Sequence, residues 1–378
     1  LYHAYHPLAG FLFGWSAFVV TYTGSIATIA VGFGHYFVTL LPSSINHLQF
    51  ILPLFKIEVN TVKLTAAAVT ILFTWLNVRG VRTGARWQSF FTFFGVLVLL
   101  LFILAAFGFG EGNWGNFNPV FPESLNSALL RGMGVALIGV YFTYSGWTVI
   151  PYLAGEVRDA QKSIPRAIIF GVLTVLLLYL LINTVYVYAL PLPEMEGVVD
   201  IGHRSLTVLL GEKWSILVTL MVLLAVLSSL NATVMSGARI YFAMSRKGRF
   251  FRMAGVLHHR YRTPANALWL QLFWSILLIV SGTFNQLLTY TVFVMLCFAI
   301  LSGISLFFLR RKGENLPVYR AWGYPVTPAL FITILFWILL NTLRQYPVQA
   351  LFGLGVVLAG IPFYYYFSWR NQASGAGK

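Results

Sequence analysis

Ten stretches of this chain are apolar enough and long enough to cross a bilayer as helices. A membrane-spanning helix needs about 20 apolar residues, and the apolar runs here are continuous, unlike the alternating segments of about ten residues in a β-barrel. We therefore predict an all-α, polytopic membrane protein, with longer loops only at 42–60, 110–131 and 191–213. The predicted transmembrane helices cover residues 8–41, 61–78, 88–109, 132–154, 164–190, 214–243, 264–281, 287–309, 325–343 and 348–369.

The fourth predicted helix is interrupted at its centre by the run YSGW, residues 144–147, and Pro151 follows a turn later. Small residues and proline weaken helical hydrogen bonding, and lipid does not tolerate unpaired backbone groups. A broken helix at membrane depth therefore persists only where its free N–H and C=O groups face protein, water or a ligand. We interpret this break as half of a substrate site.

Composition supports the membrane assignment. Hydrophobic residues make up 58% of the 378 residues and charged residues 9%, whereas soluble domains carry about 25% charged residues. The net charge of +15 would suggest nucleic-acid binding in a soluble protein. Here the basic residues lie mainly in loops between apolar segments, so we expect a lipid bilayer as a partner and no nucleic acid.

The basic residues lie mostly on one side of the predicted membrane. Eighteen of the 25 occur in the loops 79–87, 155–166, 244–263 and 310–324 or in the tail after residue 369. The opposite loops hold six, and Arg239 lies inside a predicted helix. Because cytoplasmic loops are enriched in Lys and Arg, we predict a multi-pass protein of the plasma or inner membrane with both chain ends cytoplasmic. The basic cluster at 246–262 fits this rule, with binding of anionic lipid headgroups as the alternative.

The sequence lacks the motifs of common catalytic and cofactor sites. It has no glycine-rich phosphate loop, no paired-thiolate site and no His-x-x-x-His pair, and its acidic residues lie almost entirely in loops. An intramembrane enzyme would need polar catalytic groups within its helices. We therefore expect no enzyme activity, no cofactor and no metal. The single cysteine, Cys297, lies in an apolar stretch, so we expect neither an intrachain disulfide nor a disulfide-linked partner.

Uncharged polar side chains recur inside three predicted helices. They are Thr21, Thr23, Ser25 and Thr28 in the first, Tyr141, Thr143, Tyr144, Ser145 and Trp147 in the fourth, and Ser228, Ser229, Asn231, Thr233 and Ser236 in the sixth. Such groups can orient a small zwitterion without burying an unpaired charge, and the ends of a broken helix add carbonyls for an ammonium and N–H groups for a carboxylate. The alternative is that they join helices and that the aromatic residues pack against lipid or the core.

Four stretches, taken together, resemble one transporter family. They are AYHPLAGFLFGW (4–15), NVRGVRTGARWQ (77–88), FTYSGWTVIPYLAGEVRDAQKSIPRAI (142–168) and SLNATVMSGARIYFAMSRKGRFF (229–251). In this order they resemble the amino acid–polyamine–organocation (APC) transporters, in particular the L-type amino acid transporter branch.

The resemblance implies a fold of twelve transmembrane helices, in which two inverted five-helix repeats are followed by two further helices. Under this alignment the chain 1–378 is a single transporter domain. Residues 8–309 form the remainder of the repeat core, and residues 325–369 form the last two helices. The chain would begin at the third helix of the family and lack the first two, including the family's other broken helix.

The resemblance also assigns roles to single residues. Phe142 matches the gating aromatic residue of the family, residues 144–147 match its unwound segment, and Asn231 matches a polar residue that faces the substrate. Arg239 lies near the inner gate, where we hypothesise pairing with an acidic residue. The predicted substrate site comprises Phe142, Thr143, Tyr144, Ser145, Gly146, Trp147 and Asn231, and the predicted inner gate comprises Glu156, Asp159 and Arg239.

One position departs from the family pattern. Many members carry a lysine where this chain has Gly95, seven residues after Gln88. In those members the ammonium lies where sodium binds in sodium-coupled relatives. A fixed internal cation is therefore not evident here, and coupling to a proton, coupling to sodium and exchange all stay open.

The function that follows is secondary active transport of amino acids across the membrane by alternating access. The expected partners are an amino acid substrate, the bilayer and a coupling ion, either a proton or sodium. A polyamine or cationic amino acid exchanger is one alternative, although such a ligand favours an acidic group in the pocket and none is seen at mid-depth. A membrane receptor or non-transporting subunit is another, although a signalling bundle needs no discontinuous helices.

Overall fold

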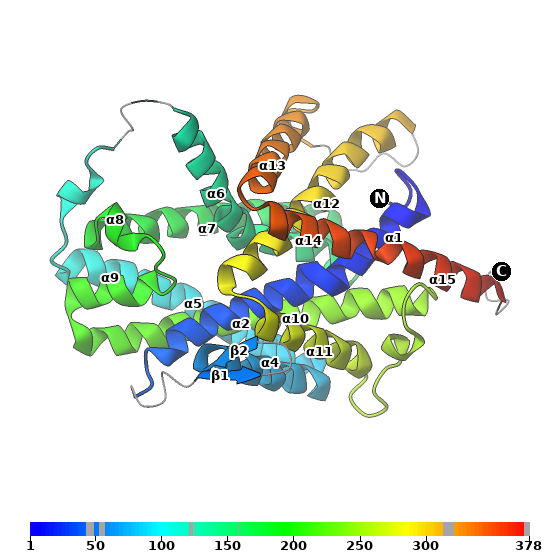
Figure 1. Cartoon of the computed structure of the whole chain (residues 1–378), viewed down its shortest axis with the longest axis horizontal. Helices are drawn as coiled ribbons and strands as arrows, with labels where there is room; N and C mark the ends of the chain where they lie inside the picture. The colour runs from blue at the N-terminus through cyan, green and yellow to red at the C-terminus, as the bar shows by residue number, and fades with distance from the viewer. Residues whose placement is uncertain are drawn as a thin grey trace.

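In the computed structural model the regular elements of the described residues are helices and one small β-ribbon (Figure 1). The structure describes residues 1–42, 49–52, 57–120, 124, 126–157, 159–312 and 321–373. Its α-helices are α1 (Pro7–Ser16), α2 (Tyr22–Val38), α4 (Thr61–Arg79), α5 (Val81–Phe109), α6 (Ser127–Thr143), α7 (Ala160–Ala189), α8 (Leu192–Met195), α9 (Ile201–Leu210), α10 (Glu212–Arg246), α11 (Ala265–Ser281), α12 (Phe284–Lys312), α13 (Val326–Gln345), α14 (Pro347–Leu358) and α15 (Gly360–Ala373). The other elements are a π-helix, η1 (Ala17–Thr21), the 3-10 helices η2 (Trp114–Phe117), η3 (Ser145–Glu156) and η4 (Arg252–Gly255), and the strands β1 (Gln49–Leu52) and β2 (Ile57–Asn60).

Each predicted transmembrane segment coincides with apolar helix. Within the described ranges, nine helical segments are long and apolar enough to span a membrane, and α11 is a shorter apolar helix of 17 residues. The first of the nine combines α1, η1 and α2, and the last combines α14 and α15. The predicted all-α, polytopic fold class is therefore confirmed. The first residues of the chain and the last helix, α15, lie toward the same end of the molecule (Figure 1).

All three longer predicted loops contain short elements, with η2 in loop 110–131; the other two, 42–60 and 191–213, hold strands or α-helices. In the first, β1 and β2 pair antiparallel, with Gln49 opposite Asn60 and Leu52 opposite Ile57. In the second, α9 buries Leu206 and Leu209 on one face, so it is a short amphipathic helix packed on the bundle. The sequence analysis did not identify these elements, because elements this short carry too few residues to display a period in the sequence.

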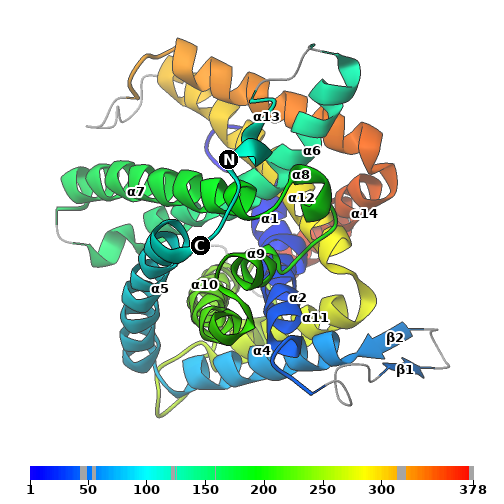
Figure 2. The same cartoon turned by 90° about the vertical axis from the view of Figure 1, so that its left-hand side faces the viewer.

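The first span is the centre of the bundle. In its most apolar window 83% of the residues are buried, compared with 11% in the span formed by α6 and η3 and 11% in α7. Figure 2 shows α2 and α10 in the middle, α5 and α7 to one side, α4 below and α13 above. The break in the fourth predicted helix therefore lies on a peripheral helix rather than in the core.

A π-helical turn, η1, divides the central span. An extra residue in a helical turn frees carbonyl groups from the regular pattern, and three side chains take them up. Tyr241 Oη donates to Ala17 O (3.1 Å), Trp274 Nε1 to Val19 O (2.8 Å) and Thr23 Oγ1 to Phe18 O (2.6 Å). Donors from α10 and α11 thus bind the carbonyl groups of the π-helical turn in the central span.

Replacing Gly34 with alanine is expected to destabilise the fold by about 1–3 kcal/mol, the usual cost of overpacking a tight contact. A Cβ at this position of α2 would lie 2.5 Å from the carbonyl oxygen of Val62 on α4, and a backbone atom cannot swing aside. A drop in the melting temperature of the purified protein in detergent measures the effect. The control is Gly32→Ala on the same helix, where the nearest atom, on Phe284, is 3.4 Å away; equal melting of both variants would contradict the prediction.

Candidate functional site

The helical break predicted at residues 144–147 is present in the structure. α6 ends at Thr143, Tyr144 has φ −92° and ψ 1°, and the chain continues from Ser145 as the 3-10 helix η3. At the junction Ser145 Oγ donates to Phe142 O (2.7 Å), and Thr148 Oγ1 donates to Ser145 O (2.8 Å). Such local bonds offer carbonyl groups an alternative to the α-helical pattern, so the polar residues of this run favour the change of helix type.

The aromatic residues of the break have different surroundings. Phe142 is half-buried and packs against the apolar cluster that joins α6, α12 and α13. The Tyr144 ring meets Tyr179 of α7 edge to face, with 5.2 Å between the ring centroids. Trp147 is 44% exposed. The residue predicted as a gate is therefore the one held by core packing, and Trp147 is the one exposed at the surface.

The break also presents open space. A Cβ added at Gly146 would meet no atom within 4 Å. Thr143 is exposed, and its hydroxyl donates to Val140 O at 2.9 Å. Hydroxyl oxygens that donate to the chain still carry lone pairs for a further donor, so the break can accept hydrogen bonds from a ligand.

Asn231, the remaining predicted substrate residue, lies in a buried network of amides. Its exposed fraction is 1%. Asn77 Nδ2 on α4 donates to Asn231 Oδ1 (2.9 Å), and Asn231 Nδ2 donates to Gln88 Oε1 on α5 (3.0 Å). Gln88 Nε2 in turn donates to Ser228 Oγ (2.9 Å), so the network joins α4, α5 and α10.

The structure does not bring Asn231 to the break through this network. η3 packs mainly on α7 and α6, whereas α10 packs mainly on α5, α2 and α9. Asn77 and Gln88 are network members that the sequence reasoning did not single out. The sequence did carry a signal, since each of two apolar stretches has an amide residue near one end. Amides buried among membrane helices usually join those helices.

The structure describes the side chains of two of the three predicted inner-gate residues. Asp159 caps α7 at its N-terminus with φ 49° and ψ 46°, and is exposed. Arg239 is half-buried on α10 and lines a cavity with residues near the N-terminus. The side chain of Glu156 lies outside the described residues. The hypothesised pairing of Arg239 with an acid therefore stays a prediction.

Gly95 lies where α5 and α10 approach closely. It is buried, and a Cβ added there would be 3.5 Å from Ala225 Cβ. Small residues allow such close contact between membrane helices, which gives this glycine a packing role of its own. A long cationic side chain at this position would have to pass between the two helices.

The apolar helices indicate a multi-pass membrane protein, and one of its candidate spans is interrupted between α6 and η3. The amino acid permease family matches residues 1–360 of the chain. The chain belongs to this family, which confirms the resemblance to APC transporters found in its motifs.

Several curated proteins are similar along nearly the whole chain. The mouse large neutral amino acids transporter small subunit 2 is 28% identical over 371 residues, covering 95% of this chain and 66% of the relative. The mouse b(0,+)-type amino acid transporter 1 is 26% identical, covering 99% and 75% respectively. The human Asc-type amino acid transporter 1 is 26% identical, covering 97% and 68%. These relatives are named as transporters rather than enzymes, and the chain spans just under two thirds of the first one's length.

Proposed function

We propose that the protein is a secondary active transporter of amino acids that works by alternating access. The observation that carries the proposal is the break between α6 and η3 in a chain of the amino acid permease family. A discontinuous membrane helix is the feature with which such folds hold a small charged substrate near mid-membrane. The relatives are all named as amino acid transporters, which supports the same substrate class.

The two arms of the break would hold the two charged groups of an amino acid. The C-terminal end of α6 carries partial negative charge on its last carbonyls, and the start of η3 carries partial positive charge on its first N–H groups. The substrate ammonium would bind at carbonyls of the break near Phe142–Tyr144 and the carboxylate at the N–H groups near Gly146. Phe142 would close over the ligand, and Glu156, Asp159 and Arg239 would form the inner gate.

The proposal extends to topology. The basic loops and both chain ends would face the cytoplasm, with the protein in the plasma or inner membrane. Residues 8–309 would belong to the inverted-repeat core and residues 325–369 to the two following helices. A coupling ion, either a proton or sodium, would drive transport if the protein does not exchange one amino acid for another.

Isotope counterflow in proteoliposomes tests the proposal. Neutral α-amino acids are expected to drive exchange of a labelled neutral amino acid, since the residues from Phe142 to Trp147 carry no charge. Polyamines, which lack a carboxylate, are expected to compete at least about tenfold more weakly. This difference corresponds to about 1.4 kcal/mol of binding free energy. Preferential competition by polyamines would favour the cationic exchanger instead. No counterflow with any amino acid would leave the non-transporting subunit as the better account.

A further inference from the structure

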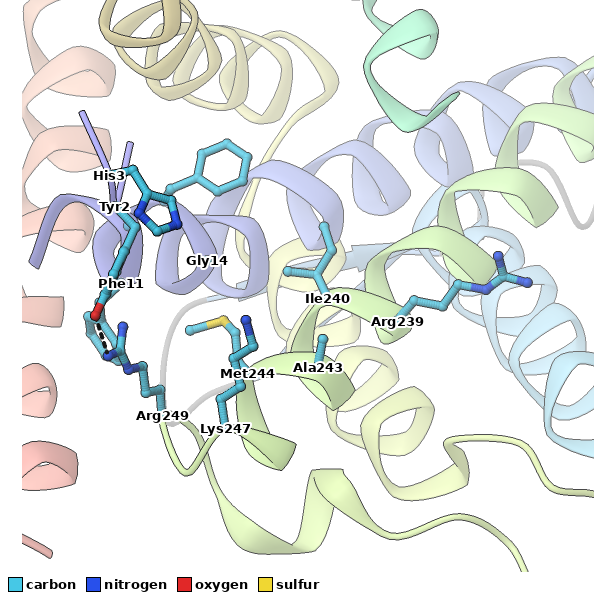
Figure 3. A pocket seen from close by; sticks show the side chains of 12 residues that line it. Tyr2, His3, Phe11, Gly14, Arg239, Ile240, Ala243, Met244, Lys247 and Arg249 are labelled. Carbon is cyan, nitrogen blue, oxygen red and sulfur yellow. Dashed lines mark hydrogen bonds between the residues drawn. The ribbon is translucent and has the colours of Figure 1, made fainter. Parts of the chain in front are cut away.

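A cavity of about 710 Å³ lies where the N-terminal segment folds over the end of α10. Tyr2 and Gly14 line one side, and Met244, Lys247 and Arg249 line the other (Figure 3). The N-terminal segment is held in place from a third helix, because Tyr5 Oη donates to Leu301 O on α12 at 2.8 Å. The cavity is thus lined by two parts of the fold that are distant in sequence, residues 2–14 and residues 239–249.

The charge of this cavity is positive. Arg249 lies over the Tyr2 ring, with Cζ 4.8 Å from the ring centroid, and also donates to Tyr2 Oη at 3.4 Å. Lys247 follows α10 directly, and Figure 3 shows its amine beside Met244 within the cavity. Arg239 lines the cavity too, but its guanidinium points away from Lys247 and Arg249. Two cationic groups therefore face the same space.

No carboxylate in the surrounding sequence offsets them. The chain has no Asp or Glu from residue 1 to 57 and none between Glu212 and Glu314, and every lining residue falls in one of these stretches. An anion entering the cavity therefore meets cations without competition from a lining carboxylate. Lys247 and Arg249 directly follow the apolar helix α10, and Lys and Arg next to the end of an apolar span attract anionic lipid headgroups.

The lining residues of α10 just before Lys247 are apolar. Ile240, Ala243 and Met244 lie on α10 within the two turns that precede Lys247, so the apolar wall extends about 10 Å from the cation. A free inorganic anion gains nothing from such a wall. An amphiphile with a charged head and an apolar body satisfies both parts of the cavity.

We propose that this cavity binds an anionic glycerophospholipid. The lipid phosphate lies between Lys247 and Arg249, and the glycerol and first acyl carbons lie along Ile240 and Met244. The site is separate from the helical break and holds the N-terminal segment against the end of α10 when lipid is bound. It is a specific lipid site, distinct from the general attraction of the whole basic loop 246–262 for a charged membrane.

Native mass spectrometry of the purified protein in neutral detergent tests this proposal, with phosphatidylglycerol as the probe and phosphatidylcholine as the reference lipid. The double variant Lys247→Gln/Arg249→Gln is expected to bind phosphatidylglycerol about 30-fold more weakly, from about 1 kcal/mol per lost cation. The matched control is Arg252→Gln/Arg260→Gln, which removes two exposed cations of the same loop outside the cavity. The control is expected to bind as the unmodified protein does.

A second variant addresses the cavity rather than its charge. Ala243→Trp adds bulk at an exposed lining position and leaves every cation in place, so it is expected to weaken phosphatidylglycerol binding by at least about tenfold. It also keeps the test decisive if the double variant does not fold. Unchanged binding in Ala243→Trp, or equal loss in the cavity and control double variants, overturns the proposal. Saturating inorganic phosphate that displaces the lipid completely would assign the site to a free anion instead.

Discussion

Gly146→Trp is expected to reduce amino acid uptake to below about a tenth of the unmodified rate. A loss of about 1.4 kcal/mol in the free energy of substrate binding already lowers the affinity tenfold. No atom lies within 4 Å of a Cβ added at Gly146, so the first atoms of the new side chain enter open space. The indole would occupy the region where the proposed carboxylate contact forms. The free energy of unfolding is expected to change by no more than about 0.5 kcal/mol. Initial uptake of a labelled neutral amino acid into proteoliposomes and the melting temperature measure the two effects.

The matched control is Gly139→Trp. Gly139 lies on α6 two turns before the break and is equally open, with no atom within 4 Å of an added Cβ. The same side chain on the same helix should therefore leave uptake near the unmodified rate. If both variants lose uptake equally, the loss follows from bulk on α6 and not from the break. Normal uptake by Gly146→Trp would remove the break from the substrate path.

The fold could be predicted from the sequence to a large extent. Continuous apolar stretches locate each span because an unpaired backbone is too costly in lipid for any structure other than helix or closed barrel. The π-helical turn at Ala17–Thr21 could not be predicted in the same way. It depends on donors from Tyr241 and Trp274, which lie more than 200 residues away in sequence, and no local pattern encodes such partners.

In the candidate site, too, the local features could be predicted from the sequence and the tertiary contacts could not. The break itself was predictable, because the polar run 144–147 acts on its own backbone through bonds such as Ser145 Oγ to Phe142 O. The surroundings of Asn231 were not, because its bonds to Asn77 and Gln88 join three helices. A polar residue inside an apolar helix is compatible with a ligand contact and with helix association, and only the tertiary packing distinguishes the two.

Asn231→Leu is expected to lower the free energy of unfolding by about 2 kcal/mol. The variant removes two hydrogen bonds and leaves the amides of Asn77 and Gln88 buried without these partners, and a buried polar group without a partner costs about 1–3 kcal/mol. The measurement is unfolding of the purified protein in mixed micelles. Asn183→Leu is the control, since Asn183 is exposed on α7 and donates to Tyr179 O of its own helix; it is expected to change stability by less than about 0.5 kcal/mol.

A double-mutant cycle then separates the network from a substrate contact. If Asn231 acts through Asn77, the changes in unfolding free energy for Asn77→Ala and Asn231→Leu are not additive, with a coupling of about 1 kcal/mol, as for other hydrogen bonds between membrane helices. Uptake falls in both single variants because each loosens the contact of α4 with α10. A substrate contact predicts a different pattern, in which Asn231→Leu alone abolishes uptake at unchanged stability and the cycle is additive. That second pattern would return Asn231 to the substrate site that the sequence resemblance implies.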